Sequence, residues 1–180
     1  CSQQLAEKGY KVLLIDQRDH IGGNSYDKYD DNGVLIHPYG PHIFHTNSER
    51  VYDFLSRFTE WRFYEHEVLA SVNGKKVPIP INRITLSKIF EKEFSENNAK
   101  SYFSKHAIKI DKIKNSEDNV LASVGEYLCD KFFRGYTKKQ WDMDLSELDA
   151  SVAARIPTRI NSDCRYFTDE YQYMPLKGYS

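Results

Sequence analysis

The apolar run Val12–Ile15 constrains this chain more than any other feature, because it ends in an acid and leads to a pair of glycines. The run is short enough for a buried strand, and Asp16 stands where that strand would leave a sheet. In dinucleotide-binding folds an acid at this point hydrogen-bonds the adenosine ribose. Gly22 and Gly23 let the backbone approach a phosphate or a ring closely. A buried strand and a turn explain the run alone, whereas the run, the acid and Gly22-Gly23-Asn24 together favour a bound flavin or nicotinamide nucleotide.

The segment before this run predicts a helix over residues 2–8, with Gly9 as its C-terminal stop. In a dinucleotide-binding fold, a helix that leads into such a strand follows an earlier strand and a Gly-x-Gly-x-x-Gly phosphate loop. The sequence has no such loop. We therefore expect a fragment that lacks roughly 15 residues of its first βα unit. Such a fragment is expected neither to bind a dinucleotide well nor to be active alone.

The bulk composition excludes several classes of function. The 180 residues carry a formal net charge of -1, which gives no electrostatic case for nucleic acid or an anionic membrane as partner. No apolar run reaches the ~18 residues that suggest a membrane-spanning helix. The three cysteines are odd in number and far apart, which favours a reducing cytoplasm over a disulfide scaffold.

The first half of the chain predicts a helix and a hairpin. Thr46 or Asn47 is expected to cap a helix that runs to Phe58. Asn73-Gly74 lies between two strand-like segments, 63–72 and 75–81, and Asn-Gly in this setting is the strongest short signal for a β-hairpin.

The second half predicts mainly helices. Asn82 is expected to cap a helix over 83–94. Apolar spacing predicts an amphipathic helix over 121–134, which Gly135 would end. The tail, residues 166–179, is aromatic and has the pattern of irregular structure.

Three histidines, His37, His42 and His45, fall within nine residues. Histidine is a common zinc ligand, but no fourth ligand lies nearby and the cysteines lie outside usual zinc spacings, so we expect no metal. Two interpretations remain open. The loop presses imidazole and backbone against a flat cofactor ring, or the histidines pack and hydrogen-bond to the main chain.

An aromatic segment covers residues 132–141. Phe132, Tyr136 and Gln140 are spaced by four and share a face if one helix runs through them. An aromatic helix end buried in a core explains this pattern. A stacking platform for a uracil or a sugar, with a hydroxyl from Thr137, explains it as well.

Arg155 and Arg159 flank Pro157, and Tyr166 follows. Two arginines beside a proline turn suit bidentate binding of a diphosphate. Solvated surface charge is the default interpretation of either arginine alone.

Together these motifs resemble the UDP-galactopyranose mutases, flavoenzymes that interconvert two ring forms of UDP-galactose. The first motif alone, Ile15–Tyr26, fits many flavin enzymes of the amine-oxidase-like type. The histidine loop and the Gly-Tyr-Thr…Gln-Trp run are more specific. In order, the motifs are 15–26, 39–46, 135–141 and 155–159.

The resemblance implies the α/β fold class, as an FAD-binding Rossmann-like domain with an inserted helical substrate domain and part of an antiparallel sheet. We expect the FAD-binding part at 1–62 and the hairpin at 63–82. The helical domain with its mobile loop is expected at 83–160, and the return to the FAD domain at 161–180.

The resemblance also implies an isomerase that converts UDP-galactopyranose to UDP-galactofuranose through a sugar adduct at N5 of reduced FAD, for galactofuranose-containing cell-surface glycans. The implied catalytic residues are Arg155, His42 and His45. The implied FAD-binding residues are Asp16, Gln17, Gly22, Gly23, Asn24, His42 and Ile43. The implied residues for UDP-galactose are His66, Phe132, Phe133, Tyr136, Thr137, Trp141, Arg155 and Tyr166.

Two residues depart from the family pattern: Asp142 follows Trp141 where bacterial members commonly have Gly, and His66 stands where Asn is often found. A homodimer is left open. The first alternative function is an FAD-dependent oxidoreductase of the amine-oxidase-like type. The second is a nucleotide-sugar-binding or metal-binding module without catalysis.

Overall fold

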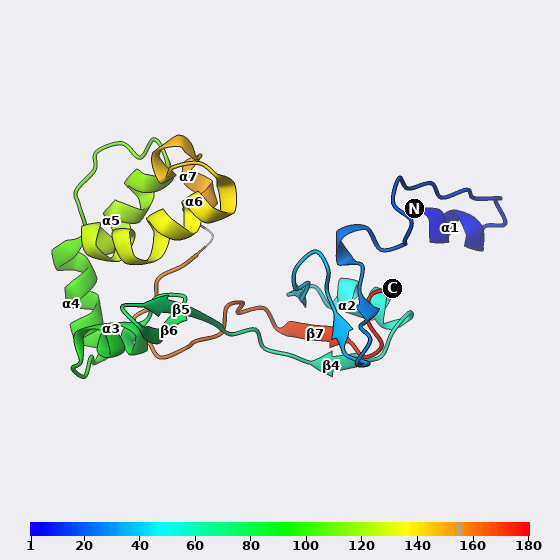
Figure 1. The fold of residues 1–180 in the computed structure, drawn as a ribbon, viewed down its shortest axis with the longest axis horizontal. Helices are drawn as coiled ribbons and strands as arrows, with labels where there is room; N and C mark the ends of the chain where they lie inside the picture. The colour runs from blue at the N-terminus through cyan, green and yellow to red at the C-terminus, as the bar shows by residue number, and fades with distance from the viewer. Residues whose placement is uncertain (155) are drawn as a thin grey trace. The chain divides into compact units, whose positions relative to one another are not determined.

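The chain folds into two compact units, which Figure 1 shows as ribbons. Unit 1 contains Cys1–Tyr64 and Asp169–Ser180, and unit 2 contains Glu65–Thr168. The computed structural model describes residues 1–154 and 156–180. No helix in these ranges is both long and apolar enough to span a bilayer.

Unit 1 is built on a three-stranded antiparallel sheet. Strand β7 (Tyr171–Pro175) lies between β3 (Phe44–Thr46) and β4 (Trp61–Phe63), and Figure 1 shows β7 beside β4. The expectation of an irregular tail is therefore wrong for residues 171–175. The strand forms because its alternate side chains have partners on α2 (Glu49–Ser56), where the Tyr52 ring stacks on Tyr171 at 4.5 Å.

Helix α2 begins one or two residues later than expected, with Ser48 as its N-cap. The two expected caps have other partners. The Thr46 hydroxyl accepts a hydrogen bond from the Ser48 main-chain nitrogen at 3.1 Å. The Asn47 side chain donates to Asp169 and accepts from the main chain of Glu170. These bonds tie the loop after β3 to the segment before β7.

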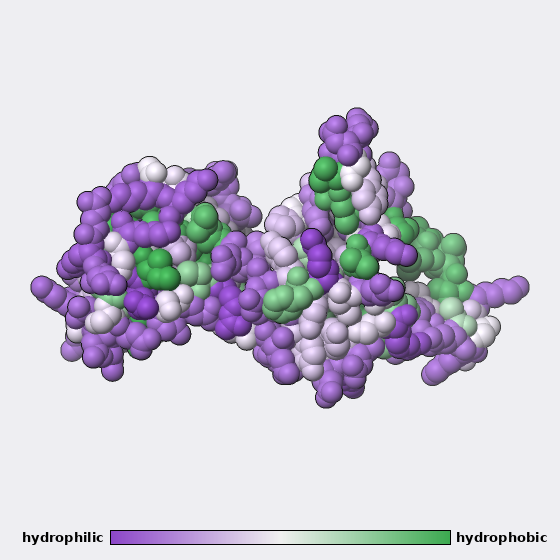
Figure 2. All heavy atoms as spheres, turned by 90° about the horizontal axis from the view of Figure 1, so that it is seen from below, coloured by the Kyte–Doolittle hydropathy of each residue, from purple (hydrophilic) through white to green (hydrophobic). Residues whose placement is uncertain are grey.

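The N-terminal helix α1 (Ser2–Glu7) forms as predicted, but the strand expected after it does not. Leu13, Leu14 and Ile15 are about 80% exposed, at 82%, 78% and 81%. Figure 2 shows exposed hydrophobic atoms in green on the surface of unit 1. A strand needs a neighbour for its main-chain groups, and within the described residues no segment pairs with 11–16. Two short strands, β1 (Lys28–Tyr29) and β2 (Leu35–Ile36), form a separate hairpin downstream.

Unit 2 begins with the predicted hairpin. Strands β5 (Val68–Val72) and β6 (Lys75–Ile79) pair antiparallel, and Asn73 and Gly74 both have positive φ, at 50° and 77°. Such φ values match the twist of the flanking strands. The segment expected as one strand over 63–72 divides, because residues 61–63 join the sheet of unit 1 instead.

Helix α3 (Arg83–Phe90) begins at the predicted cap. The buried Asn82 side chain accepts hydrogen bonds from the Ile84 and Thr85 nitrogens, at 2.9 and 3.0 Å. The helix is shorter than expected because Glu91 adopts the left-handed conformation, with φ 52°. Helix α4 (Glu96–His106) follows.

The second half of unit 2 is a nearly continuous helical run. It consists of α5 (Ser116–Leu128), the π-helix η2 (Cys129–Arg134) and α6 (Gly135–Trp141). Gly135 was expected to end a helix, but its φ of -66° is helical and the chain continues through it. Two short helices follow, η3 (Leu145–Glu147) and α7 (Ala150–Ala154).

The hydrophobic core of unit 2 draws on the hairpin and on every helix from α3 to η2. Its most buried side chains, at most 1% exposed, are Val77, Ile81, Leu86, Ala99, Val124, Leu128 and Cys129. Burial raises the pKa of the Cys129 thiol to about 11, so this cysteine stays protonated at neutral pH.

Candidate functional site

A small apolar pocket in unit 2 brings together residues that the sequence assigned to substrate binding. The pocket has a volume of about 50 Å³. Phe132, Phe133 and Tyr136 line it from the helical run, and Tyr166 lines it from a distant loop. The remaining wall consists of the aliphatic residues Val68, Ile79, Ile81 and Ile156.

The helical run fixes the exposure of the aromatic residues. Phe132 and Phe133 are 6% and 4% exposed, whereas Tyr136 is 53% exposed. Thr137 is buried, and Trp141 at the end of α6 is exposed. Two buried rings and one exposed ring around a cavity make a surface on which a flat ring can stack.

Tyr166 is held against the first residues of unit 2. Its main-chain nitrogen donates to the His66 carbonyl oxygen at 2.7 Å, and Glu67 forms a β-bridge with Arg165. The rings of His66 and Tyr166 meet edge to face, with centroids 5.8 Å apart. Partial burial lowers the pKa of His66, which favours its neutral form. His66 therefore lies beside Tyr166, which lines the pocket.

The Arg159 side chain is mostly buried, and one of its guanidinium nitrogens is bonded within its own loop. Its Nη1 donates to the carbonyl oxygens of Asp163 and Arg165, at 3.1 and 2.6 Å. Its main-chain nitrogen donates to the Ile81 carbonyl oxygen at 2.9 Å. The side chain is only 12% exposed. Arg159 thus holds the loop that carries Tyr166. The other predicted clamp residue, Arg155, lies outside the described residues.

The residues predicted to bind the cofactor all lie in unit 1. Asp16 is exposed, and its Oδ1 accepts a hydrogen bond from the Arg18 nitrogen at 2.9 Å. The Arg18 guanidinium donates to Asn24 Oδ1 at 2.7 Å and lies over the Tyr39 ring, 5.2 Å from its centroid. Arg18 therefore links the acid to the glycine turn.

The turn itself depends on glycine. Gly22 and Gly23 both have positive φ, at 84° and 57°. A Cβ on Gly22 would lie 3.3 Å from Ser180 Oγ and from the Tyr26 Cα. An exposed carboxylate next to a glycine turn suits a ribose and a phosphate, so these residues fit the dinucleotide predicted for them. Gln17 is also exposed, beside Asp16.

The histidine loop makes defined polar contacts. His42 is half-buried next to Ile43, and its Nδ1 hydrogen-bonds to the Gly40 carbonyl oxygen at 2.9 Å. His45 Nδ1 hydrogen-bonds to Asp169 Oδ2 at 2.9 Å. His37 meets the Tyr179 ring edge to face at 6.1 Å. No group of three potential metal ligands occurs in the part of the chain that the structure describes.

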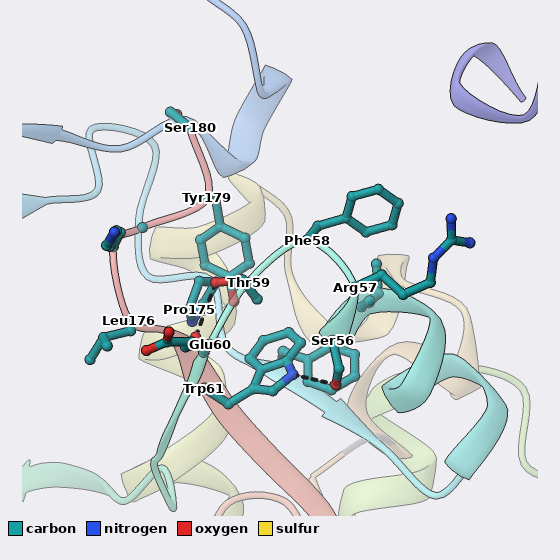
Figure 3. A pocket seen from close by; sticks show the side chains of 14 residues that line it. Ser56, Arg57, Phe58, Thr59, Glu60, Trp61, Pro175, Leu176, Tyr179 and Ser180 are labelled. Carbon is teal, nitrogen blue, oxygen red and sulfur yellow. Dashed lines mark hydrogen bonds between the residues drawn. The ribbon is translucent and has the colours of Figure 1, made fainter. Parts of the chain in front are cut away.

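Unit 1 also contains a larger cavity, of about 700 Å³, which Figure 3 shows from close by. The end of α2, the loop after it, β4 and the last residues of the chain line this cavity. Trp61 donates from Nε1 to Ser56 Oγ at 2.8 Å, drawn as a dashed line in Figure 3. None of the residues predicted to bind cofactor or substrate lines it.

Two charged residues near these sites were not predicted from the sequence. Asp27 and Arg134 each organise a buried or half-buried hydrogen-bond cluster. A single charged residue in a sequence is usually a surface residue, so no pattern separated these two from the others.

Two family models match the chain. One described as an NAD(P)-binding Rossmann-like domain matches residues 1–58. One described as UDP-galactopyranose mutase matches residues 131–180. The matched ranges include the predicted cofactor residues and most of the aromatic pocket.

Curated relatives match nearly the whole chain. It is 44% identical over 99% of its length to a probable UDP-galactopyranose mutase of Klebsiella pneumoniae. It is 39% identical over 98% to a dTDP-fucopyranose mutase of Escherichia coli, and 31% identical over 99% to a UDP-galactopyranose mutase of Mycoplasma pneumoniae. The chain spans 47% of each of these proteins, which is about half their length.

A solved structure shares the fold. The crystal structure of a reduced UDP-galactopyranose mutase matches with a TM-score of 0.65 at 20% identity, over 88% of this chain and 35% of that one. The α/β class, with a Rossmann-like part and small antiparallel sheets, is therefore confirmed. Over nearly its whole length the chain is similar to about half of a UDP-galactopyranose mutase, and the resemblance inferred from its motifs is confirmed.

Proposed function

We propose that the protein carrying this chain interconverts UDP-galactopyranose and UDP-galactofuranose with the help of bound FAD. The observation that supports this most strongly is the pocket in unit 2. Phe132, Phe133, Tyr136 and Tyr166 are brought together from separate parts of the chain, in a protein whose relatives at 31% and 44% identity have this activity in their names. Because the chain spans about half of those relatives, we also propose that it is inactive alone.

In this proposal the pocket holds the uridine end of the substrate. The uracil stacks on the aromatic residues, and His66 and Thr137 lie at hydrogen-bonding positions beside it. Trp141 flanks the sugar, and Arg155 binds the diphosphate. A guanidinium at the diphosphate stabilises the negative charge that develops on departing UDP.

The cofactor is proposed to lie on unit 1. Asp16 and Gln17 bind the adenosine ribose, and Gly22, Gly23 and Asn24 approach the phosphates. His42, Ile43 and His45 lie along the flavin ring and orient it. When bound and reduced, FAD supplies a nucleophilic nitrogen, N5, for the anomeric carbon of the sugar, so the protein itself needs no nucleophilic side chain.

The rearranged sugar nucleotide is the activated form from which galactofuranose is transferred. We therefore propose that the product serves the synthesis of galactofuranose-containing cell-surface glycans.

The test is an assay of the full-length protein that carries this chain, with UDP-galactofuranose as substrate, in the presence and in the absence of dithionite. The mutase predicts conversion to UDP-galactopyranose only when the flavin is reduced, with no net redox change. An FAD-dependent oxidoreductase predicts net oxidation of a substrate and reduction of an electron acceptor. Conversion that is equal with oxidised and reduced protein, or absent in both, contradicts the proposal.

A second sugar nucleotide needs to be tested alongside. The relative from Escherichia coli at 39% identity has dTDP-fucopyranose in its name. The assay is therefore run in parallel with dTDP-fucose in both ring forms. A kcat/KM at least tenfold higher for the UDP sugar supports the substrate proposed above, and the reverse ratio assigns the protein to the dTDP sugar.

A further inference from the structure

The helical run that carries the aromatic pocket contains two departures from α-helical geometry. Gly125, inside α5, has φ 78° and ψ 176°, so the helix is kinked there. The π-helix η2 then occupies Cys129–Arg134. Each turn of a π-helix contains an additional residue, which changes the direction in which all later side chains point. The positions of Phe132, Phe133 and Tyr136 therefore depend on where the π-helix begins and ends.

Arg134, the last residue of the π-helix, connects both sides of the kink. Its Nε and Nη2 donate to Glu117 Oε1, at 3.1 and 2.8 Å. Its Nη1 donates to Glu126 Oε1 at 2.5 Å. Glu117 lies in the first turn of α5, before the kink, and Glu126 directly follows Gly125. One guanidinium thus joins three points of the run.

The bond to Glu117 is the better shielded of the two ion pairs. The side chains of Arg134 and Glu117 are 35% and 27% exposed, so solvent screens this pair only in part, whereas the Glu126 side chain is 61% exposed. All three nitrogens of the guanidinium donate within the cluster. The Arg134 guanidinium is therefore bonded to carboxylates of the protein. Its neighbour in sequence, Phe133, lines the pocket.

We propose that Arg134 is a positioning residue for nucleoside binding: its bonds to Glu117 and Glu126 fix the register of the π-helix and so the shape of the aromatic pocket. This inference rests on the proposed function for the identity of the ligand. The effect expected on replacing Arg134 differs from the loss of a direct phosphate contact, because a change in pocket shape weakens the binding of the nucleoside itself.

The test compares Arg134→Met with Lys131→Met in the full protein. Lys131 lies in the same π-helix, but its ion pair is with the neighbouring Asp130, at 3.2 Å. Both variants remove one positive charge from η2, and only the first removes the bridge across the kink. Calorimetric titrations with uridine and with UDP give the affinities, and circular dichroism confirms that each variant is folded.

Arg134→Met is expected to lower the affinities for uridine and for UDP by the same factor, about tenfold. Lys131→Met is expected to leave both affinities unchanged. Arg134→Lys is expected to fall between Met and wild type, because an ammonium cannot join the carboxylates as a planar guanidinium does. A loss confined to UDP would show a direct phosphate contact and overturn the proposal, as would unchanged affinities.

Methyl NMR separates this inference from the proposed function. Val68, Ile79, Ile81 and Ile156 line the pocket with the aromatic rings, so their methyl shifts report ring positions without any ligand. We expect these shifts to change in Arg134→Met and not in Lys131→Met. If wild type binds neither uridine nor UDP, the proposed function fails, while the methyl shifts still decide the role of Arg134. Methyl shifts that are the same in Arg134→Met and wild type overturn that role.

Discussion

Asp27 and Tyr179 are 152 positions apart in the sequence, and the Tyr179 main-chain nitrogen donates to Asp27 Oδ2 at 2.7 Å. The other carboxylate oxygen accepts from the Ser180 nitrogen at 2.9 Å, and Asp27 is 4% exposed. Gly178 approaches so closely that a Cβ there would lie 2.6 Å from Oδ2. A buried acid thus attaches the end of the chain to the hairpin that follows the glycine turn.

Replacement of Asp27 is expected to destabilise unit 1. Asp27→Asn keeps the shape of the side chain but replaces one accepting carboxylate oxygen with an amide nitrogen, which cannot accept the N–H bond. The loss costs about 1–3 kcal/mol. Urea unfolding measures the free energy of unfolding. Asp31→Asn, in the exposed turn between β1 and β2, is the control and is expected to change it by less than ~0.5 kcal/mol. Equal effects of the two substitutions would contradict the role given to Asp27.

Gly125 is expected to tolerate no side chain. An added Cβ would lie 2.2 Å from the His106 carbonyl oxygen, and the φ of 78° disfavours L-residues. Gly125→Ala should therefore cost more than about 2 kcal/mol. Gly135→Ala is the matched control: it has helical φ and nothing within 4 Å of the added Cβ, and it should stabilise by about 0.5–1 kcal/mol. Thermal unfolding of both variants tests this difference in sign.

Asp142 is expected to be replaceable by glycine with a gain in stability. It follows α6 with φ 53°, and its nitrogen donates to the Lys138 carbonyl oxygen at 2.9 Å. Glycine adopts this left-handed cap without the strain of a Cβ, so Asp142→Gly should raise the free energy of unfolding by about 0.5–1 kcal/mol. A lower melting temperature for Asp142→Gly would contradict this reading of the cap.

His66 is expected to make stability depend on pH. Its pKa is lowered by burial, so between that pKa and the ordinary value the unfolded chain binds more protons than the folded one. Stability therefore falls as the pH drops through this window. His66→Gln removes this dependence, so the advantage of wild type over the variant should shrink from about pH 7.5 to pH 5. An advantage that stays constant across this range would show that His66 titrates alike in both states.

Local signals in the sequence predicted local structure. Asn73-Gly74 and Asn82 specified the hairpin and the start of α3, because turn and cap chemistry involves neighbours only. Residues 11–16 failed as a strand, since a strand depends on a partner elsewhere. Gly135 failed as a helix end, because a π-helix carries the backbone through it.

Four aromatic residues of the candidate pocket could be predicted from the sequence, but the hydrogen-bond clusters near them could not. Phe132, Phe133, Tyr136 and Tyr166 were assigned from motifs, and they line one pocket. The clusters around Arg134 and Arg159 were not predicted, because their partners come from other turns of the fold. The diphosphate role of Arg159 stays a prediction; in the structure its Nη1 donates to two carbonyl groups of its own loop.

The most direct measurement of the proposed site is a titration of the full protein with uridine, followed by methyl NMR of the isoleucine and valine residues. We expect saturable shifts of the methyl groups of Val68, Ile79, Ile81 and Ile156, and we expect Phe133→Ala to abolish them. Saturable uridine binding that leaves these methyl groups unmoved would place the nucleoside elsewhere and contradict the account.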